Sequence, residues 1–163
     1  MEDLIIREIL PEELGILDEM LYEAIFKPEG CAPFPRDVIQ IPEIKVYIDG
    51  FGSRKDDFCL VADLNGRIIG AVWIRILAGE IKGYGNVDDQ TPEFAISLLK
   101  EYRNRGIGTL LMQRMIEYLK NRGYAQTSLS VQKRNYAVRM YQNLGFEIIH
   151  ENEEDYLMIL KLR

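Results

Sequence analysis

A short basic turn followed by two glycines is the first part of the sequence that could do chemistry. The hydrophobic segment Phe94–Leu99 runs into this turn, where Arg103 and Arg105 precede Gly106 and Gly108. Glycine lets the backbone approach a ligand closely, and the first amides of a helix have no partner within the helix. With the helix dipole and the arginines, this pattern favours an anion site suited to a diphosphate. A helix start with solvated charges is the alternative that this segment alone leaves open.

Two well-known phosphate-binding loops do not fit this segment. A dinucleotide-binding fingerprint needs a third glycine three residues after the second, but that position is Leu111. A Walker loop needs Gly-Lys followed by Ser or Thr, and the sequence contains no such string. The sequence therefore favours neither of these nucleotide-binding classes.

The elements that must position the turn follow from hydrophobic spacing and turn residues. Helices are predicted over residues 11–26, 42–51, 106–121 and 135–143. Strands are predicted over residues 4–9, 58–62, 68–74, 94–99, 127–131, 146–149 and 156–160. The segment from 94 to 131 should form one right-handed crossover with parallel strands. Because no linker or repeat interrupts the chain, we expect a single domain over residues 1–163, with a Gly- and Asp-rich insertion at 79–92.

Composition narrows the class of protein. The chain has 163 residues, 47% of them hydrophobic, with two cysteines and one histidine. Neither cysteine has metal or redox spacing, and no apolar stretch is long enough to cross a membrane. The chain begins without the basic region of a signal peptide. We therefore expect a reduced, cytoplasmic setting, with no metal and no membrane partner.

Charge is unevenly distributed along the chain. Residues 100–139 contain nine Lys and Arg against two Glu, a net charge of +7, whereas the whole chain carries −6. The remainder therefore carries −13. This partition favours an anionic ligand at the basic turn and a cationic partner elsewhere. No nucleic-acid partner is expected, because few aromatic residues lie among the bases.

Two motifs in the expected order resemble the GNAT superfamily of N-acetyltransferases. The string Arg103-x-x-Gly106-x-Gly108 is similar to the acyl-CoA signature of that superfamily. Residues 135–146 are similar to its later segment, in which Asn, Ala, Tyr and Gly-Phe follow one another. The resemblance is anchored over residues 94–146, and the earlier part of the chain matches only in the order of its elements.

This resemblance implies an α/β (α+β) fold, with a mixed central sheet of six to seven strands and about four flanking helices. A V-shaped cleft would lie between the two central parallel strands and bind acetyl-CoA as cosubstrate. The backbone of Ile96, Ser97 and Leu98 would follow the pantetheine arm, and an N–H near Leu98 would stabilise the oxyanion. Asn135 would contact the cofactor near its sulfur. The pyrophosphate would be bound by Arg103, Asn104, Arg105, Gly106, Ile107, Gly108 and Thr109.

The chemistry also requires an acid and a base, because a primary amine with a pKa of about 10 is mostly protonated at neutral pH. By resemblance, Tyr141 would be the general acid. Some relatives carry a Glu in the strand after the crossover helix, but the matching residue here is Ser130. Glu93, at the start of the signature strand, matches the position used by other relatives and is the favoured base. The alternative bases are Glu80, Asp88 and Asp89, because the insertion at 79–92 that contains them should border the acceptor side.

The predicted function is transfer of an acetyl group from acetyl-CoA to a primary amine of a small molecule or of a peptide or protein N-terminus. The missing Glu at Ser130 favours an alternative, a non-catalytic acyl-CoA-binding or sensing module. Tyr22, Tyr47 and Tyr84 are candidates for lining the acceptor pocket, although no spacing in the sequence establishes this. Relatives are often dimers, so a homodimer is left open.

Overall fold

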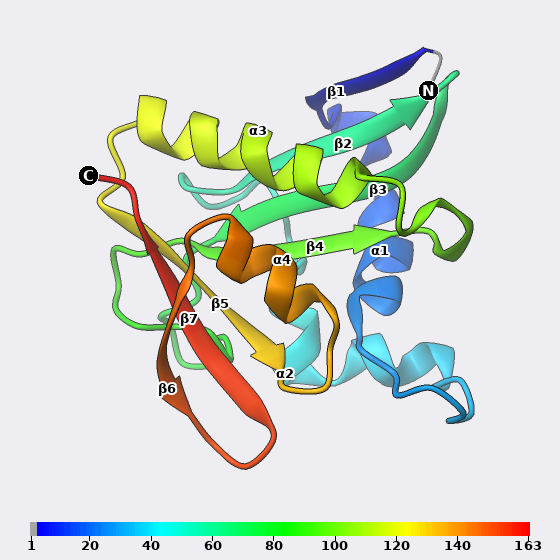
Figure 1. The fold of residues 1–163 in the computed structure, drawn as a ribbon. Helices are drawn as coiled ribbons and strands as arrows, with labels where there is room; N and C mark the ends of the chain where they lie inside the picture. Colours follow the sequence, from blue (N-terminus) through cyan, green and yellow to red (C-terminus); the bar gives the residue numbers. More distant parts are fainter. Residues whose placement is uncertain (1–2) are drawn as a thin grey trace.

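A seven-stranded mixed sheet organises the molecule (Figure 1). The computed structural model describes residues 3–163. The strand order is β1-β2-β3-β4-β5-β7-β6, and only β4 and β5 pair in parallel. This confirms the predicted mixed sheet and the predicted crossover. The strands are β1 (Leu4–Glu8), β2 (Phe58–Leu64), β3 (Arg67–Arg75), β4 (Glu93–Leu98), β5 (Gln126–Gln132), β6 (Glu147–Glu151) and β7 (Asp155–Lys161).

Helices cover both faces of the sheet. Figure 1 shows α3 and α4 in front of it and α1 and α2 behind it. Their bounds are α1 (Ile16–Ala24), α2 (Pro42–Lys45), α3 (Ile107–Asn121) and α4 (Ala137–Asn143). Three short 3-10 turns complete the order: η1 (Pro11–Glu13), η2 (Arg36–Gln40) and η3 (Lys100–Tyr102).

Two predicted helices are shorter than expected. The helix predicted over 11–26 is divided into η1 and α1, because the Glu13 side chain turns back to accept from the Leu10 amide and to pair with Arg7. The helix predicted over 42–51 is regular only over the four residues of α2. Beyond α2, the buried side chains of Trp73 and Arg75 on β3 donate hydrogen bonds to backbone carbonyls of the 46–49 turn, among them that of Tyr47. In a longer helix, the Tyr47 carbonyl would instead accept from a backbone amide of the helix.

A hydrophobic core lies on each face of the sheet, and β3 contributes alternate side chains to the two cores. Val72 and Ile74 are buried against the α3 side of the sheet, whereas Ala71 and Trp73 are buried with residues of α1. Successive side chains of a strand point to opposite faces, so a strand covered on both faces is apolar throughout. This explains why the segment 68–74 reads as an uninterrupted hydrophobic run.

The central strands β4 and β5 are paired at one point only. Glu93 lies opposite Ser128 in the single parallel register pair, and the Ser128 amide donates to the Pro92 carbonyl at 3.1 Å. After this point the two strands diverge, as Figure 1 shows. The central parallel strands therefore separate as predicted, and the opening in the hydrogen-bonded ladder between them ends at Glu93.

A buried ion pair fixes the turn that follows α2. The Arg75 guanidinium donates to both carboxylate oxygens of Asp57, at 2.9 and 2.8 Å, and both side chains are 1% exposed. The same guanidinium donates to the carbonyls of Val46 at 3.0 Å and Asp49 at 2.7 Å. Four hydrogen bonds therefore satisfy a charge that would otherwise be costly to bury.

Replacing one partner of this pair should destabilise the protein strongly. We expect Asp57→Ala to lower the free energy of unfolding by about 3–5 kcal/mol, because the guanidinium stays buried without its counter-charge. Urea unfolding measures this loss. Glu101→Ala is the matched control, since Glu101 pairs with Arg67 at 3.8 Å with both side chains more than 60% exposed. That change should cost at most about 1 kcal/mol, and equal losses for the two variants would contradict the expectation.

Candidate active site

The glycine turn has the backbone geometry of an anion site. Asn104 and Gly106 have φ values of +62° and +84°, and Gly106 caps the start of α3. The first turn of α3 contains no acidic residue. The amides of Ile107, Gly108 and Thr109 therefore begin a fifteen-residue helix with no carboxylate among them to oppose an anion.

The two arginines of the turn are placed differently. Arg103 donates through Nε to the Leu98 carbonyl at 3.1 Å and through Nη2 to the carbonyl and carboxylate of Glu23, both at 3.2 Å. Arg103 thus ties the turn to β4 and to α1. Arg105 is exposed, and its guanidinium lies 5.5 Å above the ring of Tyr102. Of the two, Arg105 has the side chain that can reach a ligand without breaking an ion pair in the described structure.

Part of β4 presents peptide groups to the opening. The Leu99 amide donates to the Ile69 carbonyl at 2.9 Å, which fixes the alternation of hydrogen bonds along β3 and β4. The peptide groups of Ile96 and Leu98 consequently face the side from which β5 has diverged, whereas those of Ser97 face β3. Of the three predicted pantetheine-contacting residues, two offer their backbone to the opening.

Glu93 is a buried carboxylate at the closed end of the opening. Its side chain accepts hydrogen bonds at Oε2 from the Tyr47 hydroxyl and from the Gly85 amide, the latter at 3.0 Å. Its Oε1 has no partner among the described residues, and the residue is 3% exposed. Burial raises the pKa of Glu93 to about 7, against the opposing effect of the two hydrogen bonds. A carboxyl group with that pKa is suited to accept a proton at neutral pH.

Two glycines of the segment between β3 and β4 close over this carboxylate. A Cβ on Gly83 would lie 2.0 Å from Oε1 of Glu93, and one on Gly85 would lie 2.8 Å from the Ser130 amide nitrogen. The Gly85 carbonyl also accepts from the Ser128 hydroxyl at 2.6 Å. Gly85 thus bridges β4 and β5 through its peptide groups. A larger residue at position 85 would have to displace the backbone of β5, and one at position 83 would have to displace the Glu93 carboxylate.

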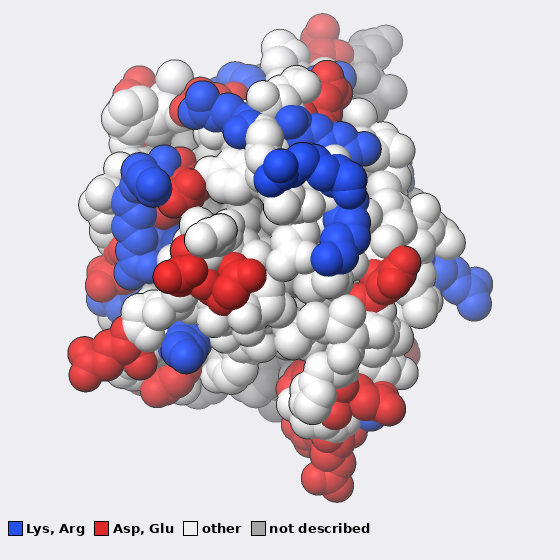
Figure 2. All heavy atoms as spheres, turned by 90° about the vertical axis from the view of Figure 1, so that its left-hand side faces the viewer, with Lys and Arg blue, Asp and Glu red and all other residues white. Residues whose placement is uncertain are grey.

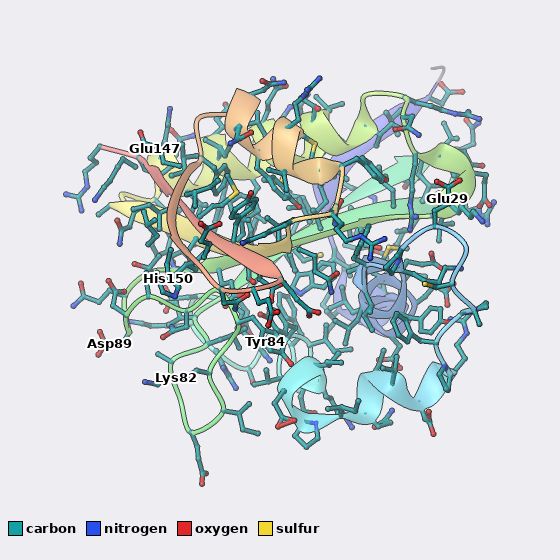
Figure 3. The ribbon with its side chains drawn as sticks, turned by 60° about the horizontal axis from the view of Figure 1, so that its bottom comes forward. Glu29, Lys82, Tyr84, Asp89, Glu147 and His150 are labelled. Carbon is teal, nitrogen blue, oxygen red and sulfur yellow. The ribbon has the colours of Figure 1, made fainter. Side chains whose placement is uncertain are left out.

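Tyr47 and these glycines are the part of the site that sequence reasoning did not assign. Tyr47 was a candidate for the acceptor pocket, and nothing in the spacing linked it to Glu93. The Tyr84 amide donates to the Tyr47 hydroxyl at 3.0 Å, which joins the β3–β4 segment to the turn after α2. Figure 3 shows Tyr84 where that segment approaches α2. The only signal in the sequence that could have indicated this part of the site is the string Gly83-Tyr84-Gly85.

The other carboxylates considered as bases lie on the surface. Glu80, Asp88 and Asp89 are all exposed, and Figure 3 shows Asp89 at the periphery of its segment. Asp88 accepts from the Gln90 amide at 2.8 Å, and this bond, together with those to Thr91, holds its pKa below the usual value. Glu93 is thus the carboxylate with the environment of a base.

Tyr141 and Asn135 come from the second motif. Tyr141 is 8% exposed, and its ring packs edge-on against Phe146 at 5.9 Å, which in turn packs against Phe94 at 5.8 Å. Burial raises the pKa of the Tyr141 hydroxyl, so it stays protonated and able to donate at neutral pH. The Asn135 side chain accepts from the amide of Ala137, the first residue of α4, at 2.9 Å.

Charge is segregated on the surface as well as along the chain. Figure 2 shows a face on which Lys and Arg gather mainly in the upper half, toward α3, and Asp and Glu predominate at the bottom. Within the described residues, no helix is long and apolar enough to span a membrane, and no group of three or more His, Cys, Asp or Glu is placed to hold a metal ion.

Residues 20–146 match the model of the Acetyltransferase (GNAT) family. This match spans well over half of the chain, and the chain therefore belongs to the GNAT family of acetyltransferases.

Relatives agree with this assignment. N-alpha-acetyltransferase 30 of Schizosaccharomyces pombe is 34% identical over 129 residues, covering 77% of this chain and 80% of the relative. An uncharacterized N-acetyltransferase of Archaeoglobus fulgidus is 30% identical over 104 residues, which are 61% of this chain and 65% of the relative. The chain thus spans less than two thirds of the archaeal relative's length.

The fold agrees with solved structures. The PaiA N-acetyltransferase of Thermoplasma acidophilum, solved in complex with coenzyme A, superposes with a TM-score of 0.71. The two sequences are 21% identical, and the match covers 98% of this chain and 99% of the other.

The raised pKa of Glu93 should be visible in stability, whatever the function. A carboxyl group with a higher pKa in the folded state stabilises the fold while protonated, and this contribution disappears as pH rises from about 4.5 to about 7. We expect the free energy of unfolding of Glu93→Gln, relative to the wild type, to rise by on the order of 3 kcal/mol between pH 5 and pH 8. Urea unfolding across this range measures it. Asp89→Asn should follow the wild-type curve, and parallel curves for Glu93→Gln would contradict the buried carboxyl.

Proposed function

We propose that this protein transfers an acetyl group from acetyl-CoA to a primary amine, with Glu93 as general base and Tyr141 as general acid. The observation that carries the proposal is the position of Glu93. Its buried carboxyl group has a pKa near neutrality and lies where β4 and β5 begin to diverge. A proton acceptor at that point suits attack on a thioester bound between the strands.

The residues present fit the cosubstrate. Its diphosphate suits the amides at the start of α3, with Arg105 free to add a charged contact and Arg103 holding the turn in place. The amide groups of the pantetheine arm suit the peptide groups of Ile96 and Leu98, which lack a strand partner on that side. Asn135 stands just before α4, and its side-chain nitrogen, which has no partner among the described residues, can face the sulfur end.

The chemistry assigns one role to each group. Glu93 accepts the proton that the amine loses as its nitrogen forms a C–N bond with the thioester carbonyl. The Leu98 amide, which faces away from β3 and lacks a strand partner there, stabilises the oxyanion that develops. As the C–S bond breaks, the Tyr141 hydroxyl donates a proton to the departing thiolate. The products are an amide and CoA.

The acceptor class is supported by one relative and by charge. The Schizosaccharomyces pombe relative, 34% identical, is named an N-alpha-acetyltransferase, which favours the terminal amine of a peptide or protein over a small molecule. The net charge of −13 outside residues 100–139 suits a cationic acceptor.

A non-catalytic acyl-CoA-binding module is the second candidate, favoured by Ser130 at the position where some relatives carry a base. It requires CoA binding without acyl transfer. Turnover therefore separates the two candidates.

Release of free thiol from acetyl-CoA, followed with a panel of peptides and small amines, tests the proposed function. We expect Glu93→Gln to lower kcat/KM by about 10²- to 10⁴-fold, because the carboxylate that accepts the proton is lost. In the wild type, kcat/KM should fall as pH drops through about 7, since protonation removes the base.

Tyr141→Phe should lower kcat with little change in CoA affinity, because the ring and its packing are kept. No turnover with any amine, with CoA bound, would favour the binding module. Wild-type activity in either variant would remove that residue from its role.

The two arginines of the turn should respond differently to replacement. Arg105→Ala should weaken CoA binding about tenfold and make it less sensitive to salt, because a phosphate contact is lost. Arg103→Ala should lower the free energy of unfolding as well, because it releases Glu23 and the Leu98 carbonyl. Calorimetric titration with CoA at two salt concentrations, together with urea unfolding, distinguishes them. An equal loss of salt sensitivity in both variants would place Arg103 on a phosphate too.

A further inference from the structure

Neither oxygen of the Glu93 carboxylate is open to a substrate. Oε1 is buried and packs against Gly83, so closely that a Cβ added to Gly83 would lie 2.0 Å from it. Oε2 is occupied by the Gly85 amide and the Tyr47 hydroxyl. A proton that reaches Glu93 without movement of the backbone must therefore pass through one of these two donors. A backbone amide does not exchange its proton readily, whereas a hydroxyl both donates and accepts.

The Tyr47 hydroxyl has an unoccupied lone pair, which such a transfer needs. It donates to Glu93 and accepts the Tyr84 amide at 3.0 Å, which uses one of its two lone pairs. The second lone pair has no donor among the described residues. Tyr47 is half-buried, whereas Glu93 is 3% exposed, so the tyrosine is the more accessible residue of the pair.

The backbone at Tyr47 is fixed by hydrogen bonds from buried side chains. The Trp73 indole donates to the Tyr47 carbonyl at 3.1 Å. Arg75, held by Asp57, donates to the carbonyls of Val46 and Asp49 on either side. A group whose backbone is held by several hydrogen bonds to buried side chains keeps its geometry during a proton transfer, as catalysis requires.

We propose that Tyr47 is a catalytic residue that relays the amine proton to Glu93. The inference rests on the proposed function, with Glu93 as the base. As the C–N bond forms, the amine N–H proton passes to the Tyr47 oxygen while the Tyr47 proton passes to Oε2 of Glu93. Tyr47 is neutral before and after the step, and Glu93 ends protonated. The reverse relay returns this proton to solvent after the product leaves, so no further reactant is needed.

Burial and the adjacent carboxylate raise the pKa of Tyr47, so a free tyrosinate does not accumulate and the two proton transfers are concerted. A relay of this kind differs from a positioning role in its dependence on pH. A hydroxyl that only held Glu93 would shift the acid limb of the rate profile and leave the high-pH plateau unchanged. A relay loses rate on the plateau as well.

Kinetics of Tyr47→Phe test the proposal. We expect kcat/KM to fall at least about 10²-fold at every pH from 6 to 9, with CoA affinity within about twofold of the wild type. Tyr124→Phe is the matched control, because its hydroxyl also donates to a carboxylate, Asp56 at 2.5 Å, outside the Glu93 network. It should keep wild-type kinetics. Recovery of the Tyr47→Phe rate at high pH would overturn the relay.

A second measurement uses the wild-type protein and does not depend on how the variant folds. With the chemical step rate-limiting, kcat in mixtures of light and heavy water should give a curved proton inventory, because two protons move together. A linear inventory would overturn the relay. If Glu93→Gln keeps wild-type activity, or if no amine is acetylated, the proposed function fails and the relay with it. If only Tyr47→Phe is normal, the relay alone fails.

Discussion

The single pairing point between β4 and β5 is the constraint on which the site depends. If β4 and β5 stayed paired, the peptide groups of Ile96 and Leu98 would form hydrogen bonds with the backbone of β5, and no room would be left for a ligand. Divergence leaves these groups without a strand partner, which is costly unless water or a ligand replaces it. Gly85 makes the divergence stable, since its N–H meets Glu93 on β4 and its carbonyl meets Ser128 on β5.

Glu93, the proposed base, is held in an environment that costs stability. A carboxylate with one unpartnered oxygen, 3% exposed, is less favourable ionised than it would be in water. Its surroundings keep it there: Gly83 and Gly85 pack over it, and Tyr47 is fixed by Trp73 and by the Arg75–Asp57 pair. Destabilised groups of this kind are typical of functional sites, where rigid neighbours hold them. The buried Arg75–Asp57 pair therefore bears on the proposed chemistry through the turn that carries Tyr47.

The sequence predicted the elements and both motifs because these are local patterns. The apolar run of β3, the glycines before α3 and the order of strands and helices are all encoded within a few residues of one another. The turn after α2 was predicted as a helix because its true determinants, Arg75 and Trp73, lie on a distant strand. For the same reason the contact between Tyr47 and Glu93, 46 positions apart, could not be inferred, since no periodicity relates them.

The absence of a carboxylate at Ser130 has less weight once the faces of the sheet are known. Leu129 and Val131 lie in the core on the α3 side, so Ser128 and Ser130 face the opposite side of β5. Phe94 lies in that same core, so Glu93 faces the opposite side of β4 as well. A base on either strand would therefore lie on the same face of the sheet, near the point where β4 and β5 separate. With Glu93 opposite Ser128 and Gly85 packed against the Ser130 backbone, the described residues place one carboxylate, that of Glu93, at this point.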